Sequence, residues 1–395
     1  MNSKKQIVPI GLLFSVAATW FGIHAGGGFA SGAQTMSFIV RWGRYGTWTF
    51  AVTFVFIALV YRELVLLGRN YQVYNFRQMV DVLYHPYNKV MSPLYEICYN
   101  MANILAIASC VAGGATVLQN LFGLNYTAGI ILIGALILVL CIFGAGLVRK
   151  ASTVFSILII LSVLIISFTA FGSSGFHLGA YLASDASNTT TLGNALYRAF
   201  CYTGFQMWCF AGVLGVSQGL ITKKSINASM AIGFIINILG LGLTCYVMLG
   251  FMPQAQSATL PLYYVCETLN QRIVLIAYTT CLFCAYISTG VGVIYGMVLR
   301  YTELFTRNKP QANKTAVNAA LGAVYIIACV LCSTFGLTPI INIGFNYMGV
   351  VGLFVVTLPA LIAGHIKNKR FEEAHPDYEK ELVAKSEQEE KKEPA

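Results

Sequence analysis

Hydrophobic residues occur along this chain in long continuous stretches, separated by short polar breaks, from about residue 9 to residue 365. Each stretch is near or above the roughly 20 residues that an α-helix needs to cross a bilayer. A transmembrane β-barrel is excluded because the stretches are continuously apolar and do not alternate. The pattern predicts ten membrane-spanning helices, at 8–40, 46–68, 91–122, 126–147, 151–172, 193–220, 225–252, 271–304, 315–335 and 339–365.

Composition supports the same conclusion. Of the 395 residues, 57% are hydrophobic and only 10% are charged, whereas about a quarter of the residues in a soluble domain are charged. The chain is therefore predicted to be an all-α integral membrane protein whose membrane region forms one domain.

The net charge of +10 is arranged by side of the membrane. If the N-terminus is cytoplasmic, all lysines and arginines fall on the inner side except Arg41, Arg44, Arg198 and Arg272. The positive-inside rule then predicts a multi-pass protein of the cell membrane with both termini in the cytoplasm. The lipid bilayer accounts for this charge pattern, so nucleic acid is not a predicted partner, and the oligomeric state is left open.

The two ends of the chain are predicted to be cytoplasmic. Two lysines and an apolar run give the N-terminus some likeness to a signal peptide, but no clear cleavage site follows. We therefore expect residues 1–6 to be a short N-terminal segment before a retained first span. Residues 367–395 are rich in charge and are expected to form a solvated, partly helical tail.

The eleven cysteines do not indicate a metal site. Cys281-x-x-Cys284 and Cys329-x-x-Cys332 copy a zinc spacing, yet both pairs lie in apolar stretches, where positions i and i+3 simply share a helix face. A zinc ribbon also needs a polar turn and about 15–20 residues between its pairs, fewer than separate these two. We predict buried cysteines that act as small hydrophobic residues, and no metal or cofactor except a coupling ion.

The first span contains an interruption. Residues 24–32 read His-Ala-Gly-Gly-Gly-Phe-Ala-Ser-Gly, and each glycine costs a helix interior roughly 1 kcal/mol relative to alanine. Gly26, Gly27 and Gly28 therefore predict that the helix opens. Open backbone at membrane depth must line a protein cavity or a ligand site, so the sequence predicts a site for a small solute or ion near the middle of the membrane.

The spans divide into five and five at the polar outer loop 173–192, giving repeats at 7–172 and 193–366. If these are inverted repeats, the sixth span should be interrupted where the first one is. Near its centre lies the segment Tyr202-Thr203-Gly204-Phe205-Gln206, followed by Trp208. The alternative, that Gly204 is only a packing glycine between helices, stays open.

The glycine run Gly-Gly-Gly-Phe-Ala-Ser-Gly-x-Gln, the segment Tyr-Thr-Gly-Phe-Gln and ten helices resemble the amino acid–polyamine–organocation superfamily, and within it the YkvI-like amino acid permeases. The resemblance covers residues 7–366. It implies the LeuT fold, a 5+5 inverted repeat with helices one and six unwound around a central site. Gln34 stands where many family members carry a glutamate, which weakens the case for a proton role at this position.

An unwound helix can bind each part of an amino acid. Half-helix N-termini present N–H groups to the carboxylate, and half-helix C-termini present carbonyls to the ammonium or to a cation. We expect the second half of span one to begin near residues 29–31 with Ser31 as its cap, although interhelical packing would explain Ser31 and the aromatic residues equally simply. The predicted substrate-binding residues are Gly26, Gly27, Gly28, Phe29, Ser31, Thr203, Gly204, Phe205, Gln206 and Trp208.

Span eight offers a site for a coupling ion. Ser288 and Thr289 place adjacent hydroxyls midway along it, and together with carbonyls from the first break they provide the oxygen shell that hard cations prefer. The resemblance implies that Ala285, Ser288 and Thr289 match the second sodium site of the LeuT fold, with carbonyls near His24 and Gly27 opposite. In some proton-coupled members of the superfamily, a lysine of span five takes the place of the ion. Residues 151–172 contain no ionisable side chain, which favours sodium as the coupling ion. Hydroxyls bonded to their own helix are the alternative.

A few ionisable and polar residues lie inside or near the spans. His24 is a candidate for proton coupling, because histidine titrates in the useful range; a neutral histidine bonded to a nearby carbonyl is the alternative. Glu96, Asn100 and Asn103 of span three are candidates for a pathway or for contacts between helices. Arg198 on the outer side of span six is a candidate gate residue, or it extends to the interface.

Together these features predict a secondary active transporter for a small neutral amino acid or a related amine, coupled to sodium or protons. The sequence has no P-loop and no metalloprotease or serine-hydrolase motif, so an enzyme is not predicted. A channel is less consistent with ten unlike helices, because pores usually come from symmetric rings. A sensor on a transporter scaffold remains an alternative. The lack of acidic residues near the breaks argues against polyamine substrates.

Overall fold

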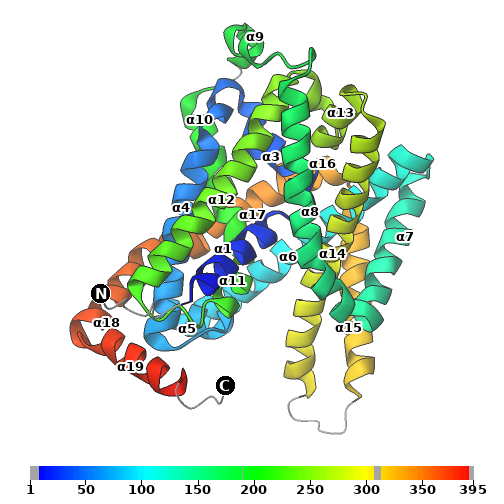
Figure 1. Ribbon diagram of the computed structural model, residues 1–395. Coiled ribbons are helices and arrows are strands. Elements are labelled where there is room, and N and C mark those ends of the chain that lie inside the picture. The colour runs from blue at the N-terminus through cyan, green and yellow to red at the C-terminus, as the bar shows by residue number, and fades with distance from the viewer. Residues whose placement is uncertain (1–8, 189, 307–312, 391–395) are drawn as a thin grey trace.

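The computed structural model describes residues 9–188, 190–306 and 313–390, so the predicted N-terminal segment 1–6 lies outside the described residues. Within these ranges all regular secondary structure is helical, and the helices form one bundle (Figure 1). Eight described helices are long and apolar enough to cross a membrane, and shorter apolar helices cover Ile10–His24 and Ile157–Phe171. The chain is an all-α, multi-pass membrane protein.

Each of the ten predicted spans coincides with helices of the structure. The elements that connect spans include η1 (Val40–Thr47), α5 (Phe76–Tyr84), α9 (Leu178–Ala183), η5 (Gln254–Ser257) and α13 (Pro261–Thr268), and α19 (Tyr378–Glu390) follows the last span. The spans are α1 (Ile10–His24) with α2 (Gly27–Ala30) and α3 (Ala33–Phe38), α4 (Thr49–Tyr71), α6 (Asn88–Phe122), α7 (Tyr126–Val139), α8 (Ala145–Phe171), α10 (Leu192–Gln206) with η4 (Met207–Cys209) and α11 (Phe210–Val216), α12 (Lys223–Gly250), α14 (Arg272–Thr306), α15 (Lys314–Ser333), and a last span from α16 (Leu337–Pro339) through η6 (Ile340–Phe345), α17 (Asn346–Gly352), η7 (Leu353–Thr357) and η8 (Ala360–Gly364) to α18 (His365–Ala374).

Local signals in the sequence set several helix ends. The Asn125 side chain accepts hydrogen bonds from backbone N–H groups in the first turn of α7, which is the usual role of an N-cap residue. Thr222 and Ser225 form a reciprocal capping box at the start of α12. Helix α6 ends at Gly123, whose φ of 66° is a left-handed conformation that glycine adopts without strain.

The long helices α6 and α14 pack against each other at the centre of the scaffold, and α14 also contacts α8 and α15. In the first half, α1 packs against α12; in the second half, α10 packs against α4. These two contacts pair the first helix of each half with the second helix of the other half, as inverted repeats require. The helices α18 and α19 lie at the opposite end of the bundle from α9 and α13 (Figure 1).

The first span is interrupted twice, once at the predicted glycine run, beside Gly26, and once beyond it. Helix α1 ends at His24, the one-turn helix α2 contains Gly27 and Gly28, and a second interruption follows at Ser31 and Gly32. Gly32 has a φ of 77°, which favours glycine. The prediction that the second half begins near residues 29–31 is therefore wrong: the helix resumes at Ala33, because the left-handed turn at Gly32 comes first.

The sixth span is also interrupted, but less strongly than the first. Helix α10 continues through Gly204 to Gln206 and then tightens into the 3₁₀ turn η4 before α11 begins. The residues that join these elements keep right-handed helical φ and ψ angles. The helix therefore narrows at Met207–Cys209 and does not open at Gly204, where the sequence suggested a break.

The charged tail is less solvated than its composition suggests. Asn368 of α18 is buried and donates to the Glu63 carboxylate at 3.0 Å. Arg69, at the end of α4, is buried as well; it forms ion pairs with Glu379 of α19 at 2.8 Å and with Glu372 of α18 at 3.6 Å. Glu379 also accepts from the backbone N–H of Lys223, the first residue of α12. The tail thus joins the predicted inner ends of α4 and α12.

Arg69→Met should lower the apparent melting temperature of the purified protein. Removing this buried guanidinium leaves its acceptors unpaired and should cost about 1–3 kcal/mol of stability. The matched control is Lys380→Met, because Lys380 pairs with Asp377 on the surface of α19 and its side chain is 83% exposed; it should melt as wild type does. Equal melting of all three proteins would contradict the docking of the tail.

Candidate functional site

The open backbone of the first span is hydrogen-bonded by neighbouring elements. The Ala30 carbonyl accepts from the Tyr278 hydroxyl of α14 at 2.7 Å. The Ser31 carbonyl accepts from the Leu262 N–H of α13 at 3.1 Å, and the Ser31 hydroxyl donates to Gly28 O at 3.0 Å. Groups from α13 and α14 thus satisfy backbone atoms that lipid could not. Interrupted backbone at this depth is enclosed by protein, as the sequence predicted.

The glycines of α2 give space to two large polar side chains. A Cβ atom on Gly27 would lie 2.2 Å from the Tyr286 ring, and one on Gly113 of α6 would lie 2.1 Å from it. A Cβ atom on Gly28 would lie 2.2 Å from the Gln34 amide. Gly27 and Gly28 are therefore needed for close packing. Tyr286 and Gln34 were not among the predicted substrate-binding residues, although three adjacent glycines are themselves a signal that something bulky approaches the backbone.

Several buried polar atoms around this break have no hydrogen-bond partner. Such atoms are rare in folded proteins and each costs about 1–3 kcal/mol. They include Gln34 Oε1 and Thr35 Oγ1 on α3 and Tyr286 Oη on α14, whereas the side chains of His24 and Asn237 lie within reach of each other. Their concentration beside the interrupted helix distinguishes this region as a candidate site for a polar ligand.

His24 lies in an aromatic environment. Its Nε2 atom shares a hydrogen bond of 2.8 Å with the Tyr202 hydroxyl of α10. The rings of Phe29 and Phe54 lie 4.9 and 5.0 Å from the imidazole, centroid to centroid. Only 4% of His24 is exposed. The predicted carbonyl partner is thus replaced by a tyrosine hydroxyl, and His24 connects the first span to the sixth.

Three of the predicted ion-coupling residues meet the first span at a cavity. This cavity has a volume of about 610 Å³ and is lined by residues of α1, α8, α12 and α14, including Ala25, Gly26, Ala285, Ser288 and Thr289. Thr289 Oγ1 lies 3.2 Å from the position that a Cβ atom on Gly26 would occupy. The polar groups of Ser288 and Thr289 in this lining are uncharged hydroxyl oxygens. His24 and Gly27 do not belong to this lining.

Ser288 also forms a hydrogen bond within its own helix, which is the alternative to a role in ion binding. Its hydroxyl donates to the carbonyl of Ala285, on its own helix, at 3.2 Å. A bond of this kind is common for serine in membrane helices, and it does not prevent the serine oxygen from accepting a second partner.

The predicted substrate-binding residues of the sixth span mainly contact other helices. The Thr203 hydroxyl donates to Ala199 O at 3.2 Å. Phe205 stacks on Phe345 of η6 at 4.1 Å. The Trp208 indole N–H donates to Met348 O of α17 at 2.9 Å. These contacts support the packing interpretation that the sequence left open, and Tyr202 is the residue that extends from this span toward the first break.

Gly204 and Gln206 also lie in packed surroundings. A Cβ atom on Gly204 would lie 2.0 Å from Gly349 O, and one on Gly349 would lie 2.2 Å from Cys201 O. Helices α10 and α17 therefore approach each other backbone to backbone. This close contact accounts for glycine at position 204, and no unwound helix is needed to explain it. The Gln206 carbonyl accepts from the Tyr61 hydroxyl of α4 at 3.0 Å.

The polar residues of the third span join α6 to α14 and α15. The Glu96 carboxylate pairs with Arg300 of α14 at 3.0 Å and accepts from the Tyr301 hydroxyl at 3.0 Å. Asn100 also donates to Tyr301 and accepts from Tyr325 of α15. Asn103 donates to Tyr99 O, within its own helix, at 2.8 Å. The structure thus uses these residues as contacts between and within helices.

Arg198 is held by specific partners and does not extend freely to the interface. Its guanidinium donates to Asn346 Oδ1 of α17 at 2.6 Å and lies 4.9 Å from the centre of the Trp42 ring of η1. A guanidinium over an indole face is a favourable cation–π geometry. Arg198 therefore joins α10, α17 and η1 at the predicted outer end of the bundle.

No protein-family model and no curated protein matches the sequence. Among solved structures, Mhp1, a transporter of the nucleobase-cation-symport-1 family, is similar at a TM-score of 0.54 and 14% identity, covering 93% of this chain and 96% of its own. A Na⁺-coupled sialic acid symporter is similar at a TM-score of 0.50 and 13% identity, covering 90% and 97%. Crystal structures of a manganese transporter from Eremococcus coleocola reach 0.47 at 12% identity, covering 95% of both chains. The chain shares the LeuT-like helical fold with Mhp1 and the sialic acid symporter.

Gly27→Ala should destabilise the protein or prevent its folding, because the new methyl group would overlap the Tyr286 ring. Overpacking of this kind costs about 1–3 kcal/mol. Gly292→Ala is the matched control, since a Cβ atom at that position of α14 meets nothing within 4 Å. Thermal melting of the purified proteins checks the difference, and the double variant with Tyr286→Ala should recover part of the loss. A Gly27→Ala protein that melts as wild type would contradict the packing of Tyr286 on α2.

Proposed function

We propose that this protein is a secondary active transporter that moves a small neutral amino acid, or a related amine, across the cell membrane by alternating access. In this proposal both termini are cytoplasmic and sodium is the coupling ion. One observation carries the proposal: the two structurally equivalent helix pairs of the fold are arranged differently on the two sides of the membrane.

The equivalent pairs are α1 with α8 in the first half and α10 with α17 in the second half, the first and fifth spans of each repeat. On the predicted outer side, α10 and α17 pack backbone to backbone at Gly204 and Gly349. On the predicted inner side, α1 and α8 line opposite parts of the 610 Å³ cavity that extends to the break at Gly26. The pair α10 and α17 is therefore in close contact, whereas the pair α1 and α8 lines a cavity. Exchange of these two arrangements is the movement that alternating access requires.

The residues present fit a sodium ion at the break. Ser288 and Thr289 supply hydroxyl oxygens beside Gly26, and a hard monovalent cation prefers oxygen ligands. A bound cation would supply a positive charge next to the open ends of α1 and α2. That one of the solved proteins with this fold is named as Na⁺-coupled supports the choice of ion. Proton coupling through His24 is the second candidate, because this ionisable side chain is buried and joins the first span to the sixth.

A neutral amino acid suits the groups around α2. The unpartnered atoms of Gln34 and Tyr286 are uncharged donors and acceptors, so they match a solute whose carboxylate and ammonium offset each other. A cation with two charges would need a carboxylate. The resemblance to YkvI-like amino acid permeases points to the same class of substrate.

Ser288→Ala combined with Thr289→Ala should reduce sodium-driven uptake of labelled neutral amino acids into proteoliposomes by roughly tenfold, equivalent to about 1.4 kcal/mol of lost ion binding. Thr280→Ala is the matched control on α14, since Thr280 is exposed and its hydroxyl bonds to Ile276 O; it should transport as wild type does. Unchanged sodium-driven uptake in the double variant would exclude this ion site. Loss of proton-driven uptake in His24→Ala would favour the proton mechanism, and an ohmic single-channel current would exclude a transporter.

Gly349→Ala should slow transport in protein that thermal melting shows to be folded. Its methyl group would collide with Cys201 O, so the closed contact of α10 with α17 would be disfavoured and the protein would remain open to the outside. Gly215→Ala on α11 is the control, because a Cβ atom there meets nothing within 4 Å. Uptake at the wild-type rate in Gly349→Ala would contradict the assignment of this contact as the outer closure.

A further inference from the structure

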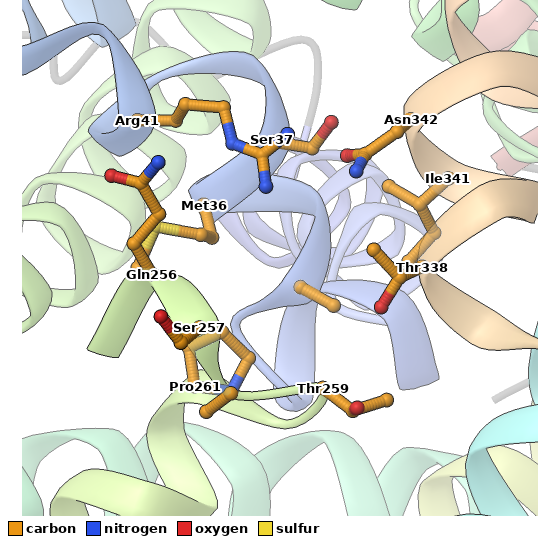
Figure 2. A pocket seen from close by; sticks show the side chains of 12 residues that line it. Met36, Ser37, Arg41, Gln256, Ser257, Thr259, Pro261, Thr338, Ile341 and Asn342 are labelled. Atoms are coloured by element: carbon orange, nitrogen blue, oxygen red, sulfur yellow. The ribbon is translucent and has the colours of Figure 1, made fainter. Parts of the chain in front are cut away.

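A small polar pocket lies at the predicted outer end of the bundle, apart from the cavity beside Gly26. Its walls come from three separate segments: α3 with η1, the η5–α13 loop, and α16 with η6. Figure 2 shows the Arg41 side chain extending across this pocket, with Gln256 on one side and Asn342 on the other. Hydroxyl groups of Ser37, Thr259 and Thr338 also line it.

Arg41 is the one charged residue in the lining of this pocket, and it lacks a counter-charge. Its Nε atom is buried without a hydrogen-bond partner, and none of the ion pairs formed among the described residues includes Arg41. Burial, and then the positive charge of Arg198, lower the pKa of Arg41. A bound anion would relieve both effects, since it pairs the guanidinium and offsets the neighbouring charge.

The pocket lies next to the first break. Its lining includes Ala33, Met36 and Ser37 of α3, and Ala33 directly follows the left-handed turn at Gly32. The loop that supplies Gln256 and Thr259 to the lining leads into α13, whose Leu262 N–H bonds to Ser31 O. A solute that moves from the outside toward the break would therefore meet this pocket first.

The geometry points to an outer carboxylate-binding site, in which Arg41 holds the carboxylate of an incoming monocarboxylic solute and the Asn342 amide adds a donor. A planar guanidinium matches a carboxylate with two parallel hydrogen bonds. The pocket volume of about 40 Å³ is only a few times the minimum for one water molecule, so it accepts such a group and excludes a whole nucleotide or sugar phosphate. Identification of the solute as an amino acid rests on the proposed transport function; the carboxylate site itself does not.

Direct binding tests the site without any gradient. The detergent-purified full chain is titrated with sodium propionate, with ethylamine, which lacks a carboxylate, and with sodium chloride at matched ionic strength, while its thermal melting is followed. We expect propionate to raise the melting temperature of wild type, and ethylamine and chloride to leave it unchanged. An equal shift with chloride, abolished by Arg41→Gln, would overturn the carboxylate assignment in favour of an inorganic anion.

Substitutions on η1 provide the matched comparison. Arg41→Gln should abolish the propionate shift, and Arg41→Lys should weaken the apparent affinity by roughly tenfold, because it keeps the charge but loses the planar fork. Arg44→Gln is the control, since Arg44 lies on the same 3₁₀ helix but is exposed and is absent from the pocket lining. Melting without ligand verifies that each variant is folded. A propionate shift that persists in folded Arg41→Gln would overturn the proposal.

Uptake measurements separate this inference from the proposed function. If the transport function and the carboxylate site are both correct, Arg41→Gln raises the KM for neutral amino acid uptake about tenfold and leaves kcat unchanged. Arg44→Gln changes neither quantity. Wild-type protein that binds propionate through Arg41 but transports no amino acid would contradict the transporter proposal and retain the carboxylate site. Uptake in Arg41→Gln with an unchanged KM would overturn the role of the site in transport.

Discussion

The structure depends on one constraint: backbone N–H and C=O groups inside a bilayer must find partners within the protein. Where the first span opens, the partners come from distant parts of the chain. The Tyr278 hydroxyl of α14 bonds to Ala30 O, and the Leu262 N–H of α13 bonds to Ser31 O. The second bond has a mechanical consequence, because it attaches the connecting helix α13 to the interrupted segment of the first span. A movement of α13 therefore changes the surroundings of the break.

Close packing around this break uses glycine for more than one physical reason. At Gly32 the backbone has a left-handed φ, whereas Gly27 and Gly113 leave space for the Tyr286 ring between α2 and α6. Gly204 and Gly349 permit a backbone-to-backbone contact of α10 with α17. The equivalent pair of the other repeat, α1 and α8, lines the cavity beside Gly26, so the two repeats pack differently.

Charge is distributed in layers along the bundle. Near the break the polar groups of Gln34 and Tyr286 are neutral, and ionic interactions lie toward the ends. At the predicted inner end the carboxylates of α18 and α19 neutralise Arg69. At the predicted outer end Arg41 forms no ion pair among the described residues. This contrast between a neutralised and an unneutralised arginine is the physical basis for proposing an anion site on one side only.

The sequence by itself determined the membrane class, the ten spans and the presence of an interruption after His24, because hydrophobic length and glycine content act locally along the chain. It also indicated that Ser288 and Thr289 face the first span. Only the tertiary structure decided where the helix opens, because Gly27 and Gly28 serve contacts with Tyr286 and Gln34 and the left-handed turn lies at Gly32. It likewise decided that Gly204 packs on α17, that the charged tail docks on α4, and that Arg41 enters a pocket. Each of these depends on a partner distant in sequence, and a one-dimensional pattern carries no information about which residue that partner is.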